Sequence, residues 1–494
     1  MKLNSDIYLG LDIGTTSVKA GLVTTEGLGL AQRSCEYPTH FPGTGCAEQS
    51  AEDWWQAACK AVRELADAFP QEAKQIKAIS ISSQAPTMLP IDAKGDPLRN
   101  ALIWMDQRAK EECGFLRQFH SDYIRRNMCN RIDPYYALPK LLWFKNNEPD
   151  RYRNAAKVLQ ANGWLVYKLT GEISIDESSA ALTQVLNVHT MKTDTAFLKE
   201  LGLDPDKWPA VYPCDAVVGH VQKSAAIAWG IPEGIPVAAG CIDGASAPLG
   251  LGLTNPEDIF EMSGQSSGIG VILNRPVYHE NLCLLRHATK DEWILKGSMS
   301  SSGGSLRWFR DTMDDKTTPF DEYNRLAELS PAGANGVIFL PYLAGERAPL
   351  WDSSLRGLFF GIGTYTAKAD MVRAVMEGSA FALRTILDEF KMQHISHNAI
   401  IQGTGGGYAS RIWSQIKSDI LNTEICASEQ VFDAAIIGNA ILAARTVGCE
   451  LHSQNNSGNS VFYKPDPKTR SLYEDRYAFF KEVFRANRKL FHER

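Results

Sequence analysis

Three short turns, rich in glycine and small hydroxyl residues, are the segments of this chain best suited to hold phosphate. They are Asp12-Ile13-Gly14-Thr15-Thr16, Ser263-Gly264-Gln265-Ser266-Ser267 and Gly403-Thr404-Gly405-Gly406-Gly407. Consecutive N–H groups of a tight turn form an anion nest, and small side chains leave room for a phosphate. One such turn is usually only the turn of a hairpin. Two similar turns together with a third before a helix are a more specific indication of a phosphate site. The G-x-x-x-x-G-K-[ST] sequence of a P-loop does not occur, which excludes that class of nucleotide site.

The first two turns belong to strand–turn–strand segments that resemble each other. Residues 7–13 and 18–24 read as two apolar strands around the first turn, and residues 258–273 repeat this layout. A repeat of this layout so far along the chain suggests that the protein consists of two related halves. We place the boundary near residues 245–255, which gives domains of residues 1–250 and 251–494.

The elements around these turns predict an α/β fold. Residues 50–68 have Ser50 as a helix cap, two acidic residues and then apolar residues at helical spacing. Residues 76–82 and 101–104 read as strands, and strands alternate with helices up to residue 250. In the second half we expect a long helix over 367–390, a polar loop over 453–460 and a terminal helix over 470–490. The terminal helix should bury a stripe made by Tyr473, Tyr477, Phe480 and Phe484.

Composition limits the classes of function. With 494 residues and ordinary apolar content, the chain can build two cores without disulfides. A net charge of -6 argues against a general nucleic-acid binder. The ten cysteines form no C-x-x-C pair, so we expect most of them to be buried thiols. Neither a signal peptide nor a membrane-spanning run is expected, and the predicted location is the cytoplasm.

Several ordered motifs carry a resemblance to a known family. The opening YLGLDIGTTSVKAGLV resembles the first phosphate loop of the actin/hexokinase/chaperone ATPase superfamily. Within it, residues 7–450 resemble the FGGY carbohydrate kinases. The C-terminal signature is matched at 357–362 (GLFFGI) and 370–377 (DMVRAVME), and the N-terminal signature at Tyr135 and 140–147, with a departure at Ala137. Further matching stretches are 104–108 (WMDQR), 339–347 (FLPYLAGER) and 405–410 (GGGYAS).

The resemblance implies two ribonuclease-H-like α/β domains of the actin-like ATPase type, with ATP and a sugar meeting in the cleft between them. Asp12 would act on Mg²⁺, directly or through water, because hard cations prefer oxygen ligands. The first turn would face the phosphates through Gly14, Thr15 and Thr16, and Lys19 either adds a charge or points outward. The second phosphate loop would be Gly264, Gln265 and Ser266. The family usually has Thr at the position of Gln265, so the role of that side chain stays open.

By the same resemblance, Asp243 is the catalytic base. An apolar strand delivers it to a strand end, where ligand sites of α/β proteins lie. Phosphoryl transfer to an alcohol needs a carboxylate within reach of the attacking hydroxyl. The nucleotide would be contacted by Gly303, Gly304, Gly406, Gly407 and Asn422. Trp308 and Trp413 are more plausible as packing aromatics than as stacking platforms.

The acceptor side departs from two branches of the family. Glycerol kinases place an Arg-Glu pair after the residue equivalent to Gln84, and xylulokinases typically place Met-His there, whereas this chain has Ala85-Pro86. After the base, those branches have Gln or Asn, and this chain has Gly244. Glycerol is therefore disfavoured, D-xylulose is not specifically indicated, and the Asp-Gly-Ala sequence resembles gluconate kinases. The substrate-side candidates are Gln84, Trp104, Asp106, Tyr135 and Asp243.

The leading interpretation is an ATP- and Mg²⁺-dependent kinase that phosphorylates a hydroxyl of a small ketose, polyol or sugar acid. A gluconate-type sugar-acid kinase is one alternative. A non-catalytic ATP-binding regulatory protein is an alternative of another class, and a chaperone-like ATPase is a third. Retention of Asp12 and Asp243 argues against the non-catalytic protein. The expected partners are ATP and a small sugar, without nucleic acid or membrane, and a homodimer is left open.

Overall fold

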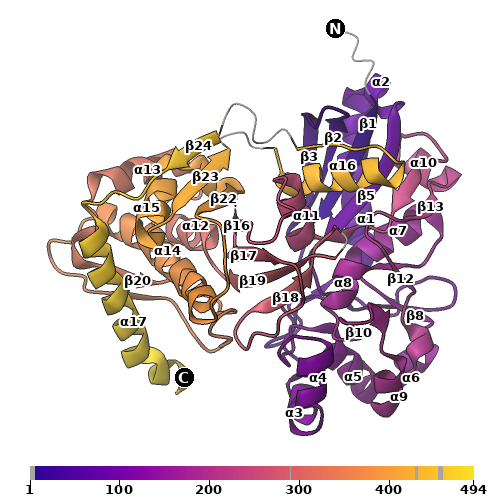
Figure 1. The fold of residues 1–494 in the computed structure, drawn as a ribbon, viewed down its shortest axis with the longest axis horizontal. Coiled ribbons are helices and arrows are strands. Elements are labelled where there is room, and N and C mark those ends of the chain that lie inside the picture. The colour runs from indigo at the N-terminus through magenta and orange to yellow at the C-terminus, as the bar shows by residue number, and fades with distance from the viewer. Residues whose placement is uncertain (1–5, 290, 429–431, 454–459, 494) are drawn as a thin grey trace.

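Two bodies, each built on a mixed β-sheet, form the molecule (Figure 1). The computed structural model describes residues 6–289, 291–428, 432–453 and 460–493. The first sheet has the strand order β13 (Val217–His220), β14 (Pro236–Ala238), β5 (Ile76–Ser83), β1 (Ile7–Ile13), β2 (Ser17–Thr24) and β3 (Gly29–Glu36), with β15 (Cys241–Ile242) also paired to β5. The second has the order β18 (Cys283–Arg286), β19 (Trp293–Met299), β17 (Ser267–Leu273), β16 (Ile259–Ser263), β22 (Ile400–Thr404), β23 (Glu424–Ser428) and β24 (Ser460–Tyr463).

The two sheets share one local plan, which confirms the predicted relation between the halves. In the first, β1 pairs antiparallel with β2 and parallel with β5. In the second, β16 pairs antiparallel with β17 and parallel with β22. Each phosphate-type turn therefore connects a hairpin whose first strand lies at the centre of its sheet. The resulting architecture is the expected two-domain α/β fold.

Alternation along β1 decides what each face of the first sheet contacts. Ile7, Leu9 and Leu11 point into a core formed with α1 (Ala51–Ala68) and α7 (Ala161–Thr170). Because side chains of a strand alternate, Gly10 and Asp12 point to the opposite face. There α16 (Ala434–Thr446) lies so close that a Cβ on Gly10 would be 2.4 Å from a main-chain oxygen of that helix. Glycine at this point lets the helix touch the sheet.

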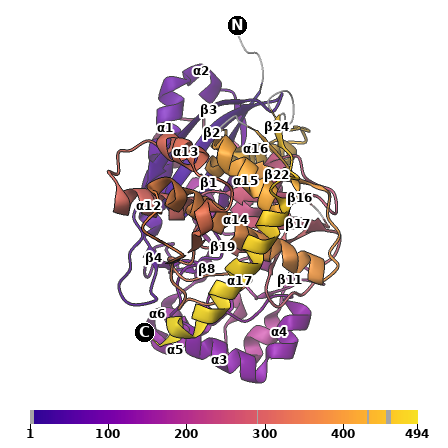
Figure 2. The same cartoon turned by 90° about the vertical axis from the view of Figure 1, so that its left-hand side faces the viewer.

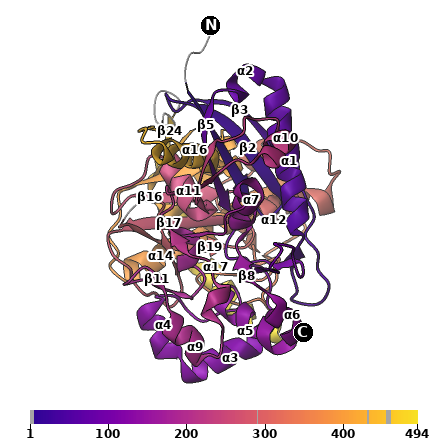
Figure 3. The ribbon, with the colours of Figure 1, turned by 90° about the vertical axis from the view of Figure 1, so that its right-hand side faces the viewer.

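The helices cover the sheets as the apolar patterns predict. Helix α1 begins after Ser50, whose hydroxyl accepts from the main-chain N–H of Asp53, and it lies beside α10 (Lys223–Trp229) on the first body (Figure 3). A helical lobe with its own core lies at one end of that body: α3 (Lys110–Phe119), α4 (Ser121–Asn127), α5 (Ala137–Asn147), α6 (Pro149–Asn154) and α9 (Thr195–Glu200). The second body carries α12 (Gly303–Met313), α13 (Phe320–Leu329), α14 (Lys368–Met392), α15 (Arg411–Leu421) and, along its outer side, α17 (Arg470–His492) (Figure 2).

Short elements complete the chain. The helical ones are α2 (Pro70–Ala73), α8 (Glu177–Ala181), α11 (Asp243–Gly250) and three 3-10 turns at Pro205–Lys207, Ala334–Gly336 and Gly406–Ala409. The short strands are β4 (Glu48–Gln49), β6 (Leu89–Ile91), β7 (Ala101–Leu102), β8 (Lys157–Leu159), β9 (Ile175–Asp176), β10 (Leu186–Asn187), β11 (Lys192–Thr193), β12 (Val211–Tyr212), β20 (Ile338–Leu340) and β21 (Leu358–Phe360).

The structure differs from the sequence-based expectations in a few places. The strand expected over 101–104 is only β7, because just two residues pair, with β4. A division at residue 250 separates the two sheets, but α16, which follows that point, packs on the first sheet. The long helix, the terminal helix and its buried Tyr473, Tyr477 and Phe480 are confirmed, whereas Phe484 is only partly buried.

Three further expectations concern the loop, the thiols and the membrane. Most of the polar loop predicted over 453–460 lies outside the described residues. The ten cysteines are free, and five of them are buried. Among the helices that the structure describes, none is both long and apolar enough to cross a bilayer.

Candidate active site

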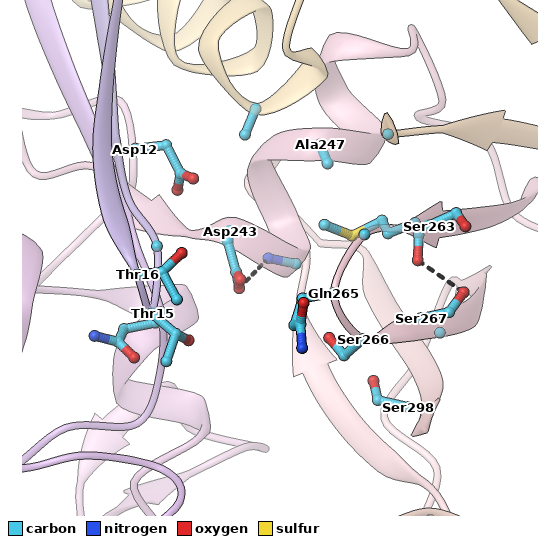
Figure 4. Close-up of a pocket in the computed structure, with 18 of the residues that line it drawn as sticks. Asp12, Thr15, Thr16, Asp243, Ala247, Ser263, Gln265, Ser266, Ser267 and Ser298 are labelled. Carbon is cyan, nitrogen blue, oxygen red and sulfur yellow. Dashed lines mark hydrogen bonds between the residues drawn. The ribbon is translucent and has the colours of Figure 1, made fainter. Parts of the chain in front are cut away.

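A cavity of about 1090 Å³ lies between the two bodies and collects most of the predicted site residues. Asp12, Thr15 and Thr16 approach it from the first body, and Gln265, Ser266 and Ser298 from the second, with Asp243 between them (Figure 4). The predicted residues that line the cavity are Asp12, Gly14, Thr15, Thr16, Lys19, Gln84, Trp104, Tyr135, Asp243, Gly264, Gln265, Ser266 and Gly406. Those outside its lining are Asp106, Gly303, Gly304, Gly407 and Asn422.

The first turn is held by one hydrogen bond that its own N–H donates and by two that its carbonyl oxygens accept. The N–H of Gly14 donates to the main-chain oxygen of Ser17 over 2.9 Å, and the Tyr37 hydroxyl donates to the oxygen of Gly14. The side-chain amide of Gln49 donates to the oxygen of Thr15 over 2.8 Å. With these oxygens engaged and Thr16 exposed at the tip, the turn presents hydroxyl and N–H groups to the cavity. This is the chemistry that a phosphate needs.

Asp12 and Lys19 are directly opposite each other on β1 and β2. Burial raises the pKa of Asp12 to about 7, although the nearby Lys19 ammonium and a 2.8 Å hydrogen bond from the Ser82 hydroxyl favour its ionised form. The Lys19 ammonium binds Asp433, the residue that caps α16. Lys19 therefore faces the cavity as an ion-paired residue, which resolves its orientation.

The second turn rests on the start of α12. The N–H groups of Gly303 and Gly304 donate to the main-chain oxygens of Gly264 and Gln265 over 3.0 and 2.9 Å. A Cβ on Gly303 would lie 2.6 Å from the oxygen of Gly264. These two glycines therefore support the turn from beneath and do not line the cavity themselves.

The third glycine loop packs on the second turn through Gly407. A Cβ on Gly407 would lie 2.1 Å from the Ser263 hydroxyl, whereas one on Gly406 would meet nothing within 4 Å. Gly406 lines the cavity together with Gly403, Thr404 and Gly405, whereas Gly407 does not. Asn422 ends α15 in a left-handed conformation, a common place for asparagine, and is exposed away from the lining.

Asp243 is the first residue of α11, directly after β15. Its Oδ1 accepts from the N–H of Gly244 over 2.6 Å, and its carboxylate lies in the lining of the cavity. Since β15 runs parallel to β5, Asp243 lies at the carboxyl end of the strands, beside Gln84. A carboxylate held here can accept a proton from a hydroxyl that enters the cavity.

Gln84, Trp104 and Tyr135, three of the predicted substrate-side residues, line the cavity. Gln84 donates its side-chain amide to Gln49 over 2.6 Å, and among the described residues its buried Oε1 has no hydrogen-bond partner. Trp104 donates to the Thr15 hydroxyl over 3.1 Å, and Tyr135 donates to the oxygen of Ala85 over 3.0 Å. The unpartnered oxygen of Gln84 is suited to accept from a hydroxyl of a polyhydroxy ligand.

Asp106 has a different environment from the one expected. It is fully buried and accepts from Arg108 and, over 2.7 Å, from the N–H of Ala47. Arg108 also binds Glu48, so these groups form a buried ionic network beside the cavity. The carboxylate is saturated with donors and does not reach the cavity lining. Trp308 stacks on Phe339, and Trp413 is buried and donates to Met376, so both are packing aromatics.

Five charged residues of the cavity were not among the sequence candidates: Arg33, Lys296, Arg307, Arg347 and Asp433. Arg347 lies in the family-like stretch 339–347, so the sequence could have identified it as a candidate site residue. Lys296 is the one charged residue of strand β19, which is otherwise apolar apart from Ser298. Asp433 gave no signal, because its place depends on the return of α16 to the first sheet.

The donor set suits a hard cation that retains water. Asp12 and Asp243 provide carboxylate oxygens on the cavity wall, and Mg²⁺ usually binds through one or two carboxylates plus phosphates and water. In the described part of the chain, no three His, Cys, Asp or Glu side chains come close enough to form a complete metal site. The residues therefore fit a cation that arrives with a nucleotide.

Comparison with known proteins identifies the family of this chain. Residues 7–250 match the N-terminal domain of the FGGY family of carbohydrate kinases, and residues 262–447 match its C-terminal domain. The chain is 31% identical to a xylulose kinase of Staphylococcus epidermidis over 98% of both chains. It is 30% identical to a gluconokinase of Bacillus subtilis, over 89% of this chain and 87% of that one. The ligand-bound xylulose kinase of Lactobacillus acidophilus superimposes with a TM-score of 0.89, at 26% identity, over 99% of both chains. By sequence and by structure, the chain belongs to the FGGY family of carbohydrate kinases.

Proposed function

We propose that this carbohydrate kinase transfers the γ-phosphoryl group of ATP to a hydroxyl of a small open-chain sugar or sugar acid. The observation that carries the proposal is the position of Asp243, between two phosphate-type turns and the unpartnered oxygen of Gln84. The relatives named for xylulose and gluconate support this acceptor class, because both compounds are small and carry several hydroxyl groups.

The two ends of the cavity have separate tasks in this proposal. The phosphates lie against Gly14–Thr16 and Gly264–Ser266, whose N–H and hydroxyl groups stabilise charge on the transferring group. The acceptor lies against Gln84, Trp104 and Tyr135, which orient its hydroxyl groups. Asp243 accepts the proton of the attacking hydroxyl, and its bond from Gly244 fixes the carboxylate plane.

Mg²⁺ is the proposed metal, with Asp12 as the protein carboxylate nearest to it, directly or through water. When bound, the ion offsets the negative charge of the phosphates. Asp12 then holds the metal–nucleotide complex in register with the first turn. The cytoplasmic location and the homodimer stay predictions.

A coupled assay of ADP release tests this function and separates it from a non-catalytic ATP-binding protein. We expect ADP only when ATP, Mg²⁺ and an acceptor are all present, and loss of turnover with chelator or with Asp12→Ala. Glycerol should be a poor acceptor, because Ala85-Pro86 offers no polar side chain to it. Full turnover by Asp12→Ala would show that Asp12 does not hold the metal. ADP release that no acceptor stimulates would contradict the proposed kinase activity.

A further inference from the structure

Lys296 is a cation of the cavity whose amino group has no oxygen partner in the part of the chain that the structure describes. It comes from β19 of the second body, and among the described residues the only hydrogen-bond acceptor of its amino group is the Met262 Sδ, at 3.4 Å. A thioether is a weak acceptor and carries no charge. An ammonium group in a protein cavity normally has a carboxylate or several oxygens around it. The ammonium group is therefore suited to bind an oxygen of a ligand that enters the cavity.

Gly244 gives this ammonium group its place beside Asp243. A Cβ built on Gly244 would lie 3.5 Å from the Lys296 Nζ, so a longer side chain at 244 would compete for the same space. Burial lowers the pKa of Lys296, and the neighbouring Asp243 carboxylate works in the opposite direction. Lys296 thus reaches across the cavity to the position next to the base.

Arg347 supplies a second cation at the same end of the cavity. Its guanidinium lies 4.4 Å from the centre of the Trp104 ring and donates to the oxygen of Met299 over 3.0 Å. Its buried Nε has no partner among the described residues. Two cations, Lys296 and Arg347, therefore face one carboxylate, Asp243, around the acceptor.

The other charges of the cavity do not offset this excess. Arg33 and Arg307 are further cations of the cavity lining, Lys19 and Asp433 bind each other, and Asp12 lies in the wall beside the first turn. The acceptor end is left with one positive charge more than negative. Such a site favours a ligand with one negative charge, since a neutral ligand would leave an ammonium group desolvated and unpaired.

We infer that the acceptor of this kinase carries a carboxylate, bound by Lys296 and Arg347, so that its natural substrate class is the aldonic acids. This inference rests on the proposed phosphotransfer and makes Lys296 a specificity-determining residue. The carboxylate replaces the missing oxygen partner of the ammonium group, and the hydroxyl chain extends toward Gln84 and Asp243.

The test compares acceptors that differ only in the charged end. Aldonates such as D-gluconate and D-xylonate are assayed beside the alditols D-glucitol and xylitol, at saturating Mg·ATP, with D-xylulose as the neutral ketose. We expect kcat/KM to favour an aldonate over its alditol by about 100-fold, because charge-assisted hydrogen bonds are strong. Lys296→Met should lower kcat/KM for the aldonate by about 10–100-fold, mainly through KM, and should lower kcat/KM for the alditol, which has no carboxylate, by a much smaller factor. Lys296→Arg should restore part of the aldonate activity.

Two controls keep the result specific. Lys77→Met removes an exposed lysine that pairs with Asp6 at the surface, and it should behave as the unaltered protein. Calorimetric binding of an aldonate to the unaltered protein and to Lys296→Met, with a nonhydrolysable ATP analogue present, measures recognition without turnover.

The outcomes separate the inference from the proposed function. A neutral acceptor as the best substrate, or an equal loss on all acceptors in Lys296→Met, would overturn the carboxylate site while the kinase stands. An equal loss of kcat/KM on all acceptors would mean that Lys296 interacts with Asp243 or with the phosphates of ATP and not with the acceptor. Aldonate binding that weakens in Lys296→Met, without ADP release from any acceptor, would support the carboxylate site and contradict the proposed phosphotransfer.

Discussion

The Lys417 ammonium group lies 2.7 Å from a carboxylate oxygen of Glu261, and both side chains are completely buried. Lys417 also donates to the Ser263 hydroxyl over 2.7 Å, and Tyr408 donates to Glu261. The pair thus joins α15, the start of the second turn and the third glycine loop. It holds together the two segments proposed to contact the nucleotide.

Breaking this pair should cost much more than losing a surface ion pair. Lys417→Met leaves the Glu261 carboxylate buried without its counter-charge, and we expect a loss of about 3–5 kcal/mol in unfolding free energy. Adding Glu261→Gln removes the stranded charge, so the double variant should be more stable than Lys417→Met alone. Urea unfolding followed by circular dichroism measures both, with Lys77→Met as the exposed control, expected within about 0.5 kcal/mol of the parent. A double variant no more stable than the single one would contradict this account.

Gly407 and Gly406 form a natural matched pair for the third loop. Gly407→Ala places a methyl group against the Ser263 hydroxyl, at a distance that real contacts do not allow, so the loop must move away from the second turn. We expect a lower melting temperature and a KM for ATP raised about tenfold or more, since a small misplacement is costly in a positioned site. Gly406→Ala should keep the melting temperature, because its Cβ would meet nothing within 4 Å. If both variants melt alike, the close approach of Gly407 is not what holds the loop.

Glu346 should make the folded state less stable as the pH rises. Burial raises the pKa of its carboxyl from 4.5 to about 7, and its Oε2 has no hydrogen-bond partner among the described residues. Because the folded pKa lies above the unfolded one, the stabilising contribution of the neutral acid is complete below about 4.5 and is lost as the pH rises through about 7.

Glu346→Gln tests this directly. The amide oxygen can still accept from the N–H groups of Ser300 and Arg347, and no charge develops. Between pH 5 and 8, the parent should lose on the order of 1–3 kcal/mol relative to the variant, in the same urea experiment. Parallel pH profiles for the two proteins would show that Glu346 does not titrate in this range.

Asp243→Asn should lower turnover by about 10²–10⁴ with little change in ATP affinity. The amide keeps the shape and can bond the acceptor hydroxyl, but it cannot take the proton. Steady-state kinetics with the best acceptor and a direct ATP-binding measurement provide the two readouts. Weaker acceptor binding at unchanged kcat would make Asp243 a binding residue. Unaltered kinetics would point to a different base, although Asp106 is enclosed by Arg108 and the N–H of Ala47.

The two bodies should close when both substrates bind. The cavity lies between them, and closure excludes water from the transferring phosphoryl group. Small-angle scattering should give a smaller radius of gyration with acceptor plus a nonhydrolysable ATP analogue than with either alone. An unchanged profile, with binding of both ligands verified by calorimetry, would count against closure.

Much of the site could be predicted from the sequence, because its main residues lie in short local patterns. Asp12 and Asp243 each follow a run of apolar residues, and each glycine turn sits between two such runs or before a helix. A pattern of period two predicts a strand, and a turn needs small residues, so neighbouring residues suffice to predict both. The two halves, the hairpins and the predicted residues that line the cavity followed from such patterns and from the family motifs.

What only the tertiary structure decided are the contacts between residues far apart in sequence. Lys19 meets Asp433 because α16 crosses back to the first sheet, where Gly10 leaves room for it. Lys296 reaches Gly244 because β19 faces α11 across the cavity, and Asp106 is withdrawn from the cavity by Arg108. Such contacts depend on how whole elements pack against one another, and packing is set by the combined shape of many side chains. No window of neighbouring residues contains that information, so the sequence indicated which groups carry the chemistry and the fold decided which of them meet.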